Sequence, residues 1–295
     1  MSIPDLCRLF GYRKQSFYQR KQVRSTQEKE VALLKEILYI RQQLPRCGVR
    51  KIHYLLSQQG FKVGRDYLFS LMRRQSLLIS KRKKYHKTTN SKHWMRKYPN
   101  IIRELEVHRP EQLWVADITY LQVQKEHYYL HLVTDAYSKK IVGYQLSNNM
   151  QASTTLKALK MAISRRKYRQ ELIHHSDRGL QYSSSIYTQT LRDNGIKISM
   201  TEQSDPYENA IAERVNGILK DEFGLDAVFE NYVLLEKQLI ESIALYNQLR
   251  PHLSIEMLTP NQAHQQQKVS LKKWKTKQPA KLVLQAVNNH SNFNT

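Results

Sequence analysis

The sequence is poor in the features that mark secreted and membrane proteins. Its 295 residues include only two cysteines, Cys7 and Cys47, which are too few and too far apart for a disulfide framework or a paired-cysteine zinc site. No apolar run reaches the length of a membrane span, and the mean hydropathy is −0.64. No basic stretch followed by an apolar one opens the chain, so we expect no signal peptide. We therefore predict a soluble protein of the reducing cytoplasm that has no membrane partner.

Acidic residues are also scarce, and they are distributed unevenly. The chain has 25 acidic and 48 basic residues and a net charge of +23. Residues 1–100 hold 24 basic and 5 acidic side chains, residues 101–267 hold 18 and 20, and residues 268–295 hold six lysines and no acid. Clustered Lys and Arg displace condensed counterions from a phosphate backbone and so favour binding to it. We expect a nucleic-acid partner, because a charge that served only solubility would be spread more evenly.

Residues 1–24 predict a helix-turn-helix-like segment. Apolar side chains at helical spacing precede Gly11, and a second short segment follows it. That second segment carries Arg13 and Lys14, which we predict to contact DNA phosphates. A helical hairpin with only a structural role fits the same pattern, so this segment alone does not decide between the two.

Residues 25–100 predict a basic, all-helical DNA-binding region that ends in a linker. Apolar residues follow the 3.6-residue repeat in three stretches, which Pro45 and Gly60 interrupt. The predicted helices are 28–44, 49–59 and 66–75. The linker after them is polar, lacks periodicity and is rich in basic residues. Its predicted DNA contacts are Lys81, Arg82, Lys83 and Lys84.

A change from helical to strand-like spacing marks a second region from Gln112 onwards. Three closely spaced runs rich in Val, Ile, Thr and Tyr predict an antiparallel meander, and an alternation of helices and strands follows it. This order predicts an α/β domain with a mixed sheet. The predicted strands are 113–123, 128–134, 141–146, 172–175 and 196–200, and the predicted helices are 152–166, 186–194 and 208–223.

Three acidic residues of this region are candidates for a metal site. Asp117 lies inside an apolar strand, where an ionised carboxylate is costly unless a cation or hydrogen bonds compensate it. Asp177 follows another strand at its carboxyl end, where α/β sheets place ligands, and Glu213 lies in the last predicted helix. Converging carboxylates repel one another, and hard divalent cations such as Mg²⁺ or Mn²⁺ relieve the repulsion. Two such ions, about 3.5 to 4 Å apart, would serve phosphodiester chemistry.

Each of these residues also has a less specific explanation. A single aspartate in a strand is more often a salt-bridged or capping residue, and only the set of three in matching contexts favours the metal site. His174 and His175 alternate across a strand and cannot both face one ion, so we expect His174 to pack in the core. Arg178 could order the loop after Asp177 or bind phosphate, and the sequence leaves both open.

The acids lie within motifs that resemble those of a known family. Thirty-five residues separate Asp177 from Glu213, the spacing of the signature of bacterial insertion-sequence transposases. The chain resembles in particular the second-frame (OrfB) protein of the IS-three group, whose core is similar to that of retroviral integrases. The resemblance extends from the leading segment through Gly48-Val49-Arg50-Lys51-Ile52 to Thr259-Pro260. The main matching motifs are Trp114-x-x-Asp117-Ile118-Thr119-Tyr120, His175-Ser176-Asp177-Arg178-Gly179-x-Gln181-Tyr182, Tyr207-x-Asn209-Ala210-x-x-Glu213 and Tyr246-Asn247-x-x-Arg250-Pro251-His252.

The resemblance implies a DNA transposase with a ribonuclease-H-like core. In such a core a mixed five-stranded sheet with flanking helices carries two aspartates on neighbouring strands, and a helix supplies the glutamate. The implied reaction is metal-dependent DNA cleavage and strand transfer at insertion-sequence ends, with Asp117, Asp177 and Glu213 as the catalytic and metal-binding residues. Lys220 lies about two turns after Glu213 on the same helical face, and integrase-like cores hold a basic residue near DNA there. The implied division places the catalytic core at 108–225, a helical extension at 226–267 and a basic tail at 268–295.

The resemblance also implies partners and leaves an alternative function. The partners would be double-stranded DNA at the element ends and at the target, further copies of the chain on DNA, and an upstream-frame (OrfA) protein. The chain contains no long heptad run, so it could instead be a non-catalytic DNA-binding regulator of transposition that needs such a partner. Either protein would be associated with the nucleoid, and we expect no counterpart of the amino-terminal zinc site of the retroviral relatives.

Two further motif segments have structural interpretations. Tyr207 and Asn209 are expected to shape the turn before the Glu213 helix and to cap that helix. The segment 250–252 either ends and docks the preceding helix or contacts DNA, and the sequence leaves both open.

Overall fold

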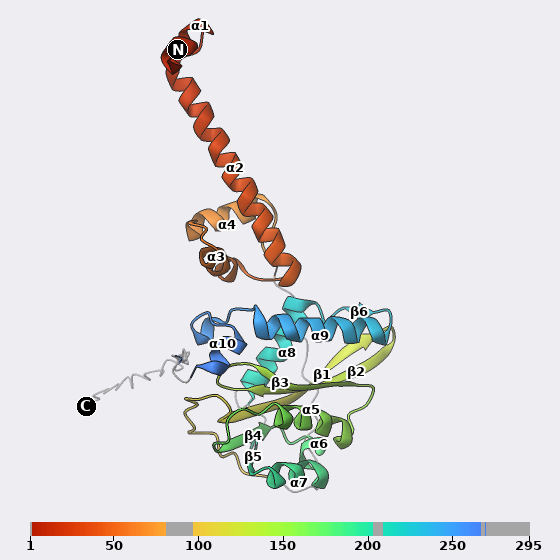
Figure 1. Ribbon diagram of the computed structural model, residues 1–295. Coiled ribbons are helices and arrows are strands. Elements are labelled where there is room, and N and C mark those ends of the chain that lie inside the picture. The colour runs from red at the N-terminus through yellow and green to blue at the C-terminus, as the bar shows by residue number, and fades with distance from the viewer. Residues whose placement is uncertain (1, 81–96, 203–208, 267–268, 270–295) are drawn as a thin grey trace, which may run out of the picture.

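The N-terminal third of the protein forms a helical unit with a long projecting arm (Figure 1). The computed structural model describes residues 2–80, 97–202, 209–266 and Val269. In the helical unit (residues 2–80), α3 and α4 lie against the C-terminal half of α2, whose N-terminal half projects away with α1 at the tip (Figure 1). The helices are α1 (Ile3–Leu9), α2 (Lys14–Gln43), α3 (Val49–Gln58) and α4 (Arg65–Arg74).

Helix α2 is one continuous helix where the sequence predicts two separate ones. The predicted segment after Gly11 and the predicted helix 28–44 both fall largely within its 30 residues. Neither proline nor glycine occurs between Lys14 and Gln43, so no residue in this stretch breaks the helix. At about 1.5 Å per residue, α2 is about 45 Å long. Gly11, with a φ of 70°, makes the turn between α1 and α2.

The helical unit shares one apolar core with the rest of the molecule. Ile52 of α3 and Leu68 of α4 are fully buried in one cluster with Ile37 of α2. The same cluster continues into Leu219 and Phe223 of α8 (Ala210–Phe223). Burying such a side chain contributes on the order of 1.5 to 3 kcal/mol, so this cluster holds the helical unit against the part of the protein that follows.

That second part is built on a mixed sheet and is called the sheet core here (residues 113–266). The strand order is β3-β2-β1-β4-β5, in which β1, β2 and β3 are antiparallel and β4 and β5 run parallel to β1. A sixth, two-residue strand pairs with the far end of β1. The strands are β1 (Leu113–Val123), β2 (Glu126–Asp135), β3 (Ile141–Ser147), β4 (Leu172–Ser176), β5 (Ile196–Met200) and β6 (Val228–Phe229).

Helices cover both faces of the sheet (Figure 1). Helices α5, α6 and α7 lie on one face, and α8 and α9 lie on the other, between the sheet and the helical unit. Apolar clusters fill both layers, with Leu159 and Leu191 in the first and Val215 and Leu235 in the second. The remaining helices are α5 (Ala152–Ser164), α6 (Leu180–Ser183), α7 (Ser185–Asp193), α9 (Tyr232–Gln248), the 3-10 turn η1 (Leu253–Ile255) and α10 (Pro260–Gln265).

This architecture confirms the expected ribonuclease-H-like fold, with a mixed five-stranded sheet that an all-helical region precedes. The observed strands β1 to β5 begin and end within two residues of the predicted ranges. Strand β6, helices α6 and α10, and the 3-10 turn η1 were not predicted. In the described part of the chain, no helix has both the length and the apolar character that crossing a membrane requires.

Candidate active site

The pairing of β1 with β4 brings Asp117 and Asp177 to the same level of the sheet. The two strands run parallel, and their register pairs Val115 with His175. Asp117 and Asp177 each lie two residues beyond that pair along the chain. Side chains at the same level of neighbouring strands point to the same face, so the two carboxylates lie side by side at the carboxyl edge of β4. Both residues are half-buried.

Helix α8 brings Glu213 to the same edge. Asn216 Nδ2 donates a hydrogen bond of 2.8 Å to Asp117 Oδ2, which fixes this face of α8 against β1. Glu213 lies three residues before Asn216, and residues three apart share one face of a helix. Asn216 is buried, whereas Glu213 is exposed. The third acid therefore faces solvent beside the two aspartates.

The other two acids act electrostatically on Asp117. Burial and the charge of Asp177 raise the pKa of Asp117 to about 7, and Glu213 adds to the shift. Hydrogen bonds from Asn216 and from the backbone N–H of Ile118 act in the opposite direction. With a pKa of about 7, Asp117 is only about half ionised at neutral pH when no cation is bound.

Asp177 lies in a tight turn that needs a glycine. Its Oδ1 accepts a hydrogen bond of 3.0 Å from the backbone N–H of Gly179. A Cβ at position 179 would lie 3.0 Å from that oxygen and 2.8 Å from Nε2 of Gln181, so a larger residue would displace the Gln181 side chain and press on the Asp177 carboxylate. Arg178 between them is half-buried. The close approach of the backbone to the carboxylate therefore explains the glycine of this motif.

Buried aromatic residues pack next to Asp177. Tyr182 and Tyr187 meet edge to face with ring centroids 5.5 Å apart, and the Tyr187 hydroxyl is hydrogen-bonded to His174 Nε2 at 3.0 Å. His174 is buried, as expected for a packing role, and burial lowers its pKa to about 3. The Tyr182 hydroxyl is buried and has no hydrogen-bond partner among the described residues. Burial raises its pKa, and the charges of Asp177 and Asp117 add to the shift.

A side-chain hydrogen bond ties the start of α8 to the sheet, and it differs from the predicted one. Asn209 occupies the N-cap position, as expected, but its side chain makes no capping hydrogen bond. Its Nδ2 instead donates to the carbonyl oxygen of Ala116 at 3.1 Å. This bond holds the first turn of α8 beside Asp117, while the Asn209 Oδ1 that a cap would use has no hydrogen-bond partner among the described residues. Tyr207, the other residue predicted to shape this turn, lies outside the described residues.

The predicted DNA contacts lie in separate places. Lys220 on α8 is half-buried; burial lowers its pKa, and the charges of Asp117 and Asp226 oppose that shift. Lys220 therefore belongs to the edge that holds the acids. Arg13 and Lys14 are exposed where α2 begins, at the tip of the arm (Figure 1). The other predicted contacts, Lys81, Arg82, Lys83 and Lys84, fall outside the described residues.

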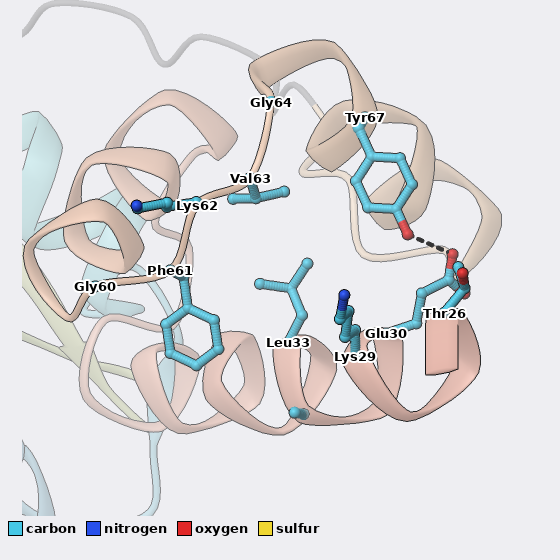
Figure 2. A pocket seen from close by; sticks show the side chains of 11 residues that line it. Thr26, Lys29, Glu30, Leu33, Gly60, Phe61, Lys62, Val63, Gly64 and Tyr67 are labelled. Atoms are coloured by element: carbon cyan, nitrogen blue, oxygen red, sulfur yellow. Dashed lines mark hydrogen bonds between the residues drawn. The ribbon is translucent and has the colours of Figure 1, made fainter. Parts of the chain in front are cut away.

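A pocket of about 660 Å³ lies in the helical unit and not at the acids. It is formed between α2 and the turn that joins α3 to α4, with Leu33, Phe61 and Val63 among its lining residues (Figure 2). At one end the Tyr67 hydroxyl donates a hydrogen bond of 2.6 Å to Glu30 Oε1 (Figure 2). All residues that line it lie between positions 26 and 67. The acids therefore occupy an edge of the sheet instead of this pocket.

The donor set at the acid edge suits a divalent cation. Carboxylate oxygens are the hard ligands that Mg²⁺ and Mn²⁺ prefer. Burial and, after it, the charge of Asp177 raise the pKa of Asp117, and a bound cation would offset both effects. Over the described ranges, no three His, Cys, Asp or Glu side chains form a group that could by itself hold a metal ion. The residues fit an ion that completes its ligand shell with water and substrate oxygens, as magnesium usually does.

Two family models match the sheet core and its flanks. Both describe an integrase core domain; one matches residues 107–206 and the other residues 194–260. The matched residues include all three acids and the helix that carries Glu213.

Individual relatives match most of the chain. A 31 kDa protein of insertion element IS600 from Shigella sonnei is 32% identical over 261 residues, which are 86% of this chain and 96% of the relative. The transposase for insertion sequence element IS629 from Shigella sonnei is 30% identical over 256 residues, 84% of this chain and 86% of the relative. Among solved structures, the magnesium complex of the HTLV-2 integrase catalytic core domain matches with a TM-score of 0.43 and 22% identity, covering 53% of this chain and 97% of that one.

Proposed function

The chain belongs to the insertion-sequence transposases that contain an integrase core domain, and on this premise we propose that Asp117, Asp177 and Glu213 are its catalytic residues. The proposed reaction is cleavage of DNA at the ends of an insertion sequence and joining of the resulting 3′ hydroxyl to another phosphodiester. The observation that carries the proposal is the register of β1 and β4, which sets the two aspartates side by side. The hydrogen bond from Asn216 to Asp117 supports the place of Glu213 beside them.

Two Mg²⁺ ions are the proposed cofactor, held by the same three carboxylates. Bound there, they would supply Lewis-acid stabilisation of the phosphodiester and activation of a water or a 3′ hydroxyl. The state of Asp117 supports this proposal, because its pKa of about 7 leaves it partly protonated at neutral pH. Cation binding is therefore expected to release a proton from Asp117 and to weaken as the pH falls.

The residues around the acids are proposed to position them and to reach the substrate. Asn216 holds the Asp117 carboxylate in one orientation, and Asn209 holds the start of α8 against β1. Lys220, half-buried on α8, is proposed to contact a DNA phosphate and not to transfer protons. Arg178 is proposed to bind phosphate from the turn that follows β4.

The substrate is proposed to be double-stranded DNA, at the element ends and at the target. The support is the concentration of charge, since residues 1–100 hold 24 basic and 5 acidic side chains. The exposed Arg13 and Lys14 at the tip of the arm are proposed phosphate contacts, as are the four basic residues at 81–84. Further copies of the chain on the DNA and an upstream-frame protein are the proposed protein partners.

Single isosteric substitutions of the acids test the assignment. Asp117→Asn, Asp177→Asn and Glu213→Gln are each expected to slow Mg²⁺-dependent cleavage and joining of labelled element ends on the order of a thousandfold or more. Each removes a charge at the reacting phosphodiester and leaves the basic helical unit intact, so the affinity for the same DNA is expected to persist. Asp193→Asn, at an exposed position at the end of α7, is the matched control and is expected to keep full activity.

Two results would contradict the proposal. An acid whose substitution leaves the strand-transfer rate unchanged is not a catalytic residue. An unaltered chain that binds element ends but cuts them in neither Mg²⁺ nor Mn²⁺ would instead be a DNA-binding regulator, and addition of the upstream-frame protein would show whether that partner restores cleavage.

A further inference from the structure

Two motifs that the proposed reaction does not use meet at one carboxylate, Glu222. This residue is the next to last of α8, the helix that also carries Glu213. Lys51, from the segment 48–52 of the helical unit, and Arg250, from the segment 246–252 that ends α9, both pair with it. We call these three side chains the Glu222 junction. It joins the helical unit, α8 and the end of α9.

Arg250 binds Glu222 in a bidentate geometry. Nε donates to Oε2 at 2.8 Å and Nη2 donates to Oε1 at 2.6 Å, so both side chains are fixed in one orientation. Arg250 is only 2% exposed. Its Nη1 lies 2.8 Å from His252 Nε2, which accepts the hydrogen bond because a guanidinium can only donate. The segment 250–252 therefore anchors the end of α9 on α8, which decides between the two interpretations left open by the sequence in favour of docking.

Lys51 approaches the same carboxylate from the helical unit. Its Nζ donates to Oε1 at 3.0 Å and to Oε2 at 2.9 Å. The side chains of Lys51 and Glu222 are 11% and 15% exposed, so water screens this ion pair little. A second link runs beside it, because the backbone N–H of Arg46 donates to the Glu222 carbonyl at 3.2 Å and its guanidinium lies 3.4 Å from Asp221.

The junction and the Arg46 link beside it are the directional parts of the contact between the helical unit and α8, and the junction is the less exposed of the two. The apolar cluster that the two share is non-directional, since burial depends on area and not on angle. A shielded carboxylate between two cations has strict geometry, because a partner that moves away leaves a charge without water or counter-charge. Turning the helical unit over the apolar cluster would therefore break the bond from Lys51.

We propose that Glu222 is a positioning residue that, through Lys51, sets the orientation of the basic helical unit relative to α8 and so selects which phosphodiester of the bound DNA reaches the acids. Arg250 holds the Glu222 carboxylate in place for this role. The claim that Glu222 selects the phosphodiester rests on the proposed function. The claim that Glu222 sets the orientation of the helical unit does not.

Substitutions on the two sides of the junction test the choice of phosphodiester. Lys51→Met keeps the apolar stem and removes the charge, and Glu222→Gln keeps the shape and removes the charge on α8. In both, the fraction of cuts at the position that the unaltered chain uses is expected to fall on the order of tenfold, with cuts spread over neighbouring phosphodiesters. Total cutting and DNA affinity are expected to change little, whereas a loss of stability alone would lower total cutting without moving its position.

Two further variants serve as controls. Lys51→Arg preserves the ion pair and is expected to keep the single cut position. Arg74→Met is matched to Lys51→Met, because Arg74 pairs with Glu30 at 2.8 Å inside the helical unit. It removes one cation and one ion pair without touching the sheet core, and it is expected to leave the cut position unchanged.

A distance measurement tests the orientation without DNA or metal. Nitroxide labels at Ser57→Cys on α3 and Lys160→Cys on α5 occupy exposed positions, while the native thiols Cys7 and Cys47 are buried. Pulsed EPR is expected to give one narrow distance for the unaltered chain, Lys51→Arg and Arg74→Met, and a broad distribution for Lys51→Met and Glu222→Gln.

The outcomes separate the two proposals. A narrow distance in Lys51→Met, or a single cut position in that variant, would overturn the role of the junction. If no chain cuts DNA, the proposed function fails and the EPR distances alone decide the orientation. If Glu222→Gln does not fold, Lys51→Met carries the test, because it leaves the bond between Arg250 and Glu222 in place.

Discussion

Among single residues, Asp117 has opposing requirements, because the ionised carboxylate proposed to bind metal ions is the form that destabilises the folded protein. Burial and the charge of Asp177 raise its pKa from 3.8 to about 7. For an acid whose pKa is higher in the folded state, ionisation opposes folding. The stability that the protonated carboxyl contributes is complete below pH 3.8 and is lost as the pH rises through about 7. Without a cation, the residue proposed to hold the metal ions therefore destabilises the protein at neutral pH.

Asp117→Asn is accordingly expected to stabilise the metal-free protein. The amide removes the charge but can still accept the hydrogen bond from Asn216. In EDTA at pH 8 the melting temperature, followed by circular dichroism, is expected to rise on the order of several degrees. At pH 4.5 the rise is expected to be much smaller, because Asp117 is already protonated in the folded state there.

The same melting experiment contains its controls. Asp193→Asn, at an exposed position, is expected to leave the melting temperature unchanged at both pH values. Mg²⁺ in place of EDTA is expected to narrow the difference between the unaltered chain and Asp117→Asn, because a bound cation stabilises the ionised carboxylate. Equal melting temperatures in EDTA at pH 8 would contradict the raised pKa.

Among the elements, α10 is held by a buried polar cluster. His264 Nε2 lies 3.3 Å from Glu111 Oε1, and His264 Nδ1 lies 3.6 Å from Asp135 Oδ1. Ser138 Oγ donates to the same Asp135 oxygen at 2.6 Å, and the Tyr168 hydroxyl donates to the His264 carbonyl at 3.0 Å. These groups replace water as partners of the buried charges and so dock α10 on the end of β2.

The docking of α10 is expected to depend on pH. Burial disfavours a charged His264, but the bonds to Asp135 and Glu111 outweigh burial and raise its pKa above 6.5. Burial also disfavours a charged Glu111, but its hydrogen bonds outweigh burial and lower its pKa below 4.5. The stability that a charged His264 contributes is lost as the pH rises through the raised pKa of His264. The stability that an ionised Glu111 contributes is lost as the pH falls through the lowered pKa of Glu111. α10 is therefore docked most firmly between about pH 4.5 and 6.5.

Hydrogen exchange can follow this element alone. The protection factors of the α10 amides are expected to fall between pH 6 and pH 8.5 in the unaltered chain. In His264→Gln they are expected to be low at both pH values and to show no pH trend. Helix α7 serves as the internal reference, and protection of α10 that is independent of pH in the unaltered chain would contradict the role of His264.

The elements that local sequence patterns describe could be predicted, and those that depend on distant contacts could not. β1 and β5 have the predicted bounds, because β-branched and aromatic residues cluster there between polar turns. Strand β6 has only two residues, too few for any periodicity. The continuous α2 was missed because the apolar pattern fades in the projecting arm, where few side chains of the described residues are buried; only the absence of Pro and Gly indicated it.

Among the site residues, the same distinction between local and distant information holds. Asp117, Asp177 and Glu213 stand out because acids are unusual in their local contexts and lie in recognisable motifs. Asn216 and Glu222 do not stand out, since a polar residue on a helix is ordinary. Their partners lie 99 and 171 positions away along the chain, at Asp117 and Lys51, so only the fold reveals them.

In the molecule as a whole, the basic charge lies in the N-terminal third and extends along the projecting arm. The basic residues gather in the N-terminal third, and the sheet core is nearly neutral. Helix α2, about 45 Å long, carries exposed basic residues to a tip far from the sheet (Figure 1). That length exceeds one turn of B-DNA, which is about 34 to 36 Å. DNA bound along the arm is therefore expected to extend well beyond the phosphodiester that reacts.

The salt dependence of binding tests this use of the arm. Replacing Arg13 and Lys14 together with glutamine is expected to lower the slope of log K against log salt by about 2, because each phosphate contact contributes about 0.9. The measurement is a titration of an element-end duplex of about 40 base pairs, long enough at 3.4 Å per base pair to reach the tip.

A second pair of lysines provides the control for that titration. Lys157 and Lys160 are exposed on α5, on the face of the sheet away from the helical unit (Figure 1). Their replacement by glutamine removes the same charge and is expected to leave the slope unchanged. An equal loss of slope in both double variants would mean that the tip makes no specific contact and that only net charge matters.

The raised pKa of Asp117 also affects what happens when the gene acquires a mutation at this codon. On the proposed function, a codon change from aspartate to asparagine at this position is expected to end the reaction and to relieve the electrostatic cost of the ionised carboxylate. The inactive product is expected to fold more stably at neutral pH and to keep its basic helical unit and the Glu222 junction. It would then occupy the same DNA ends as the product of an intact copy. One substitution would thus convert a mobile enzyme into its own durable competitor.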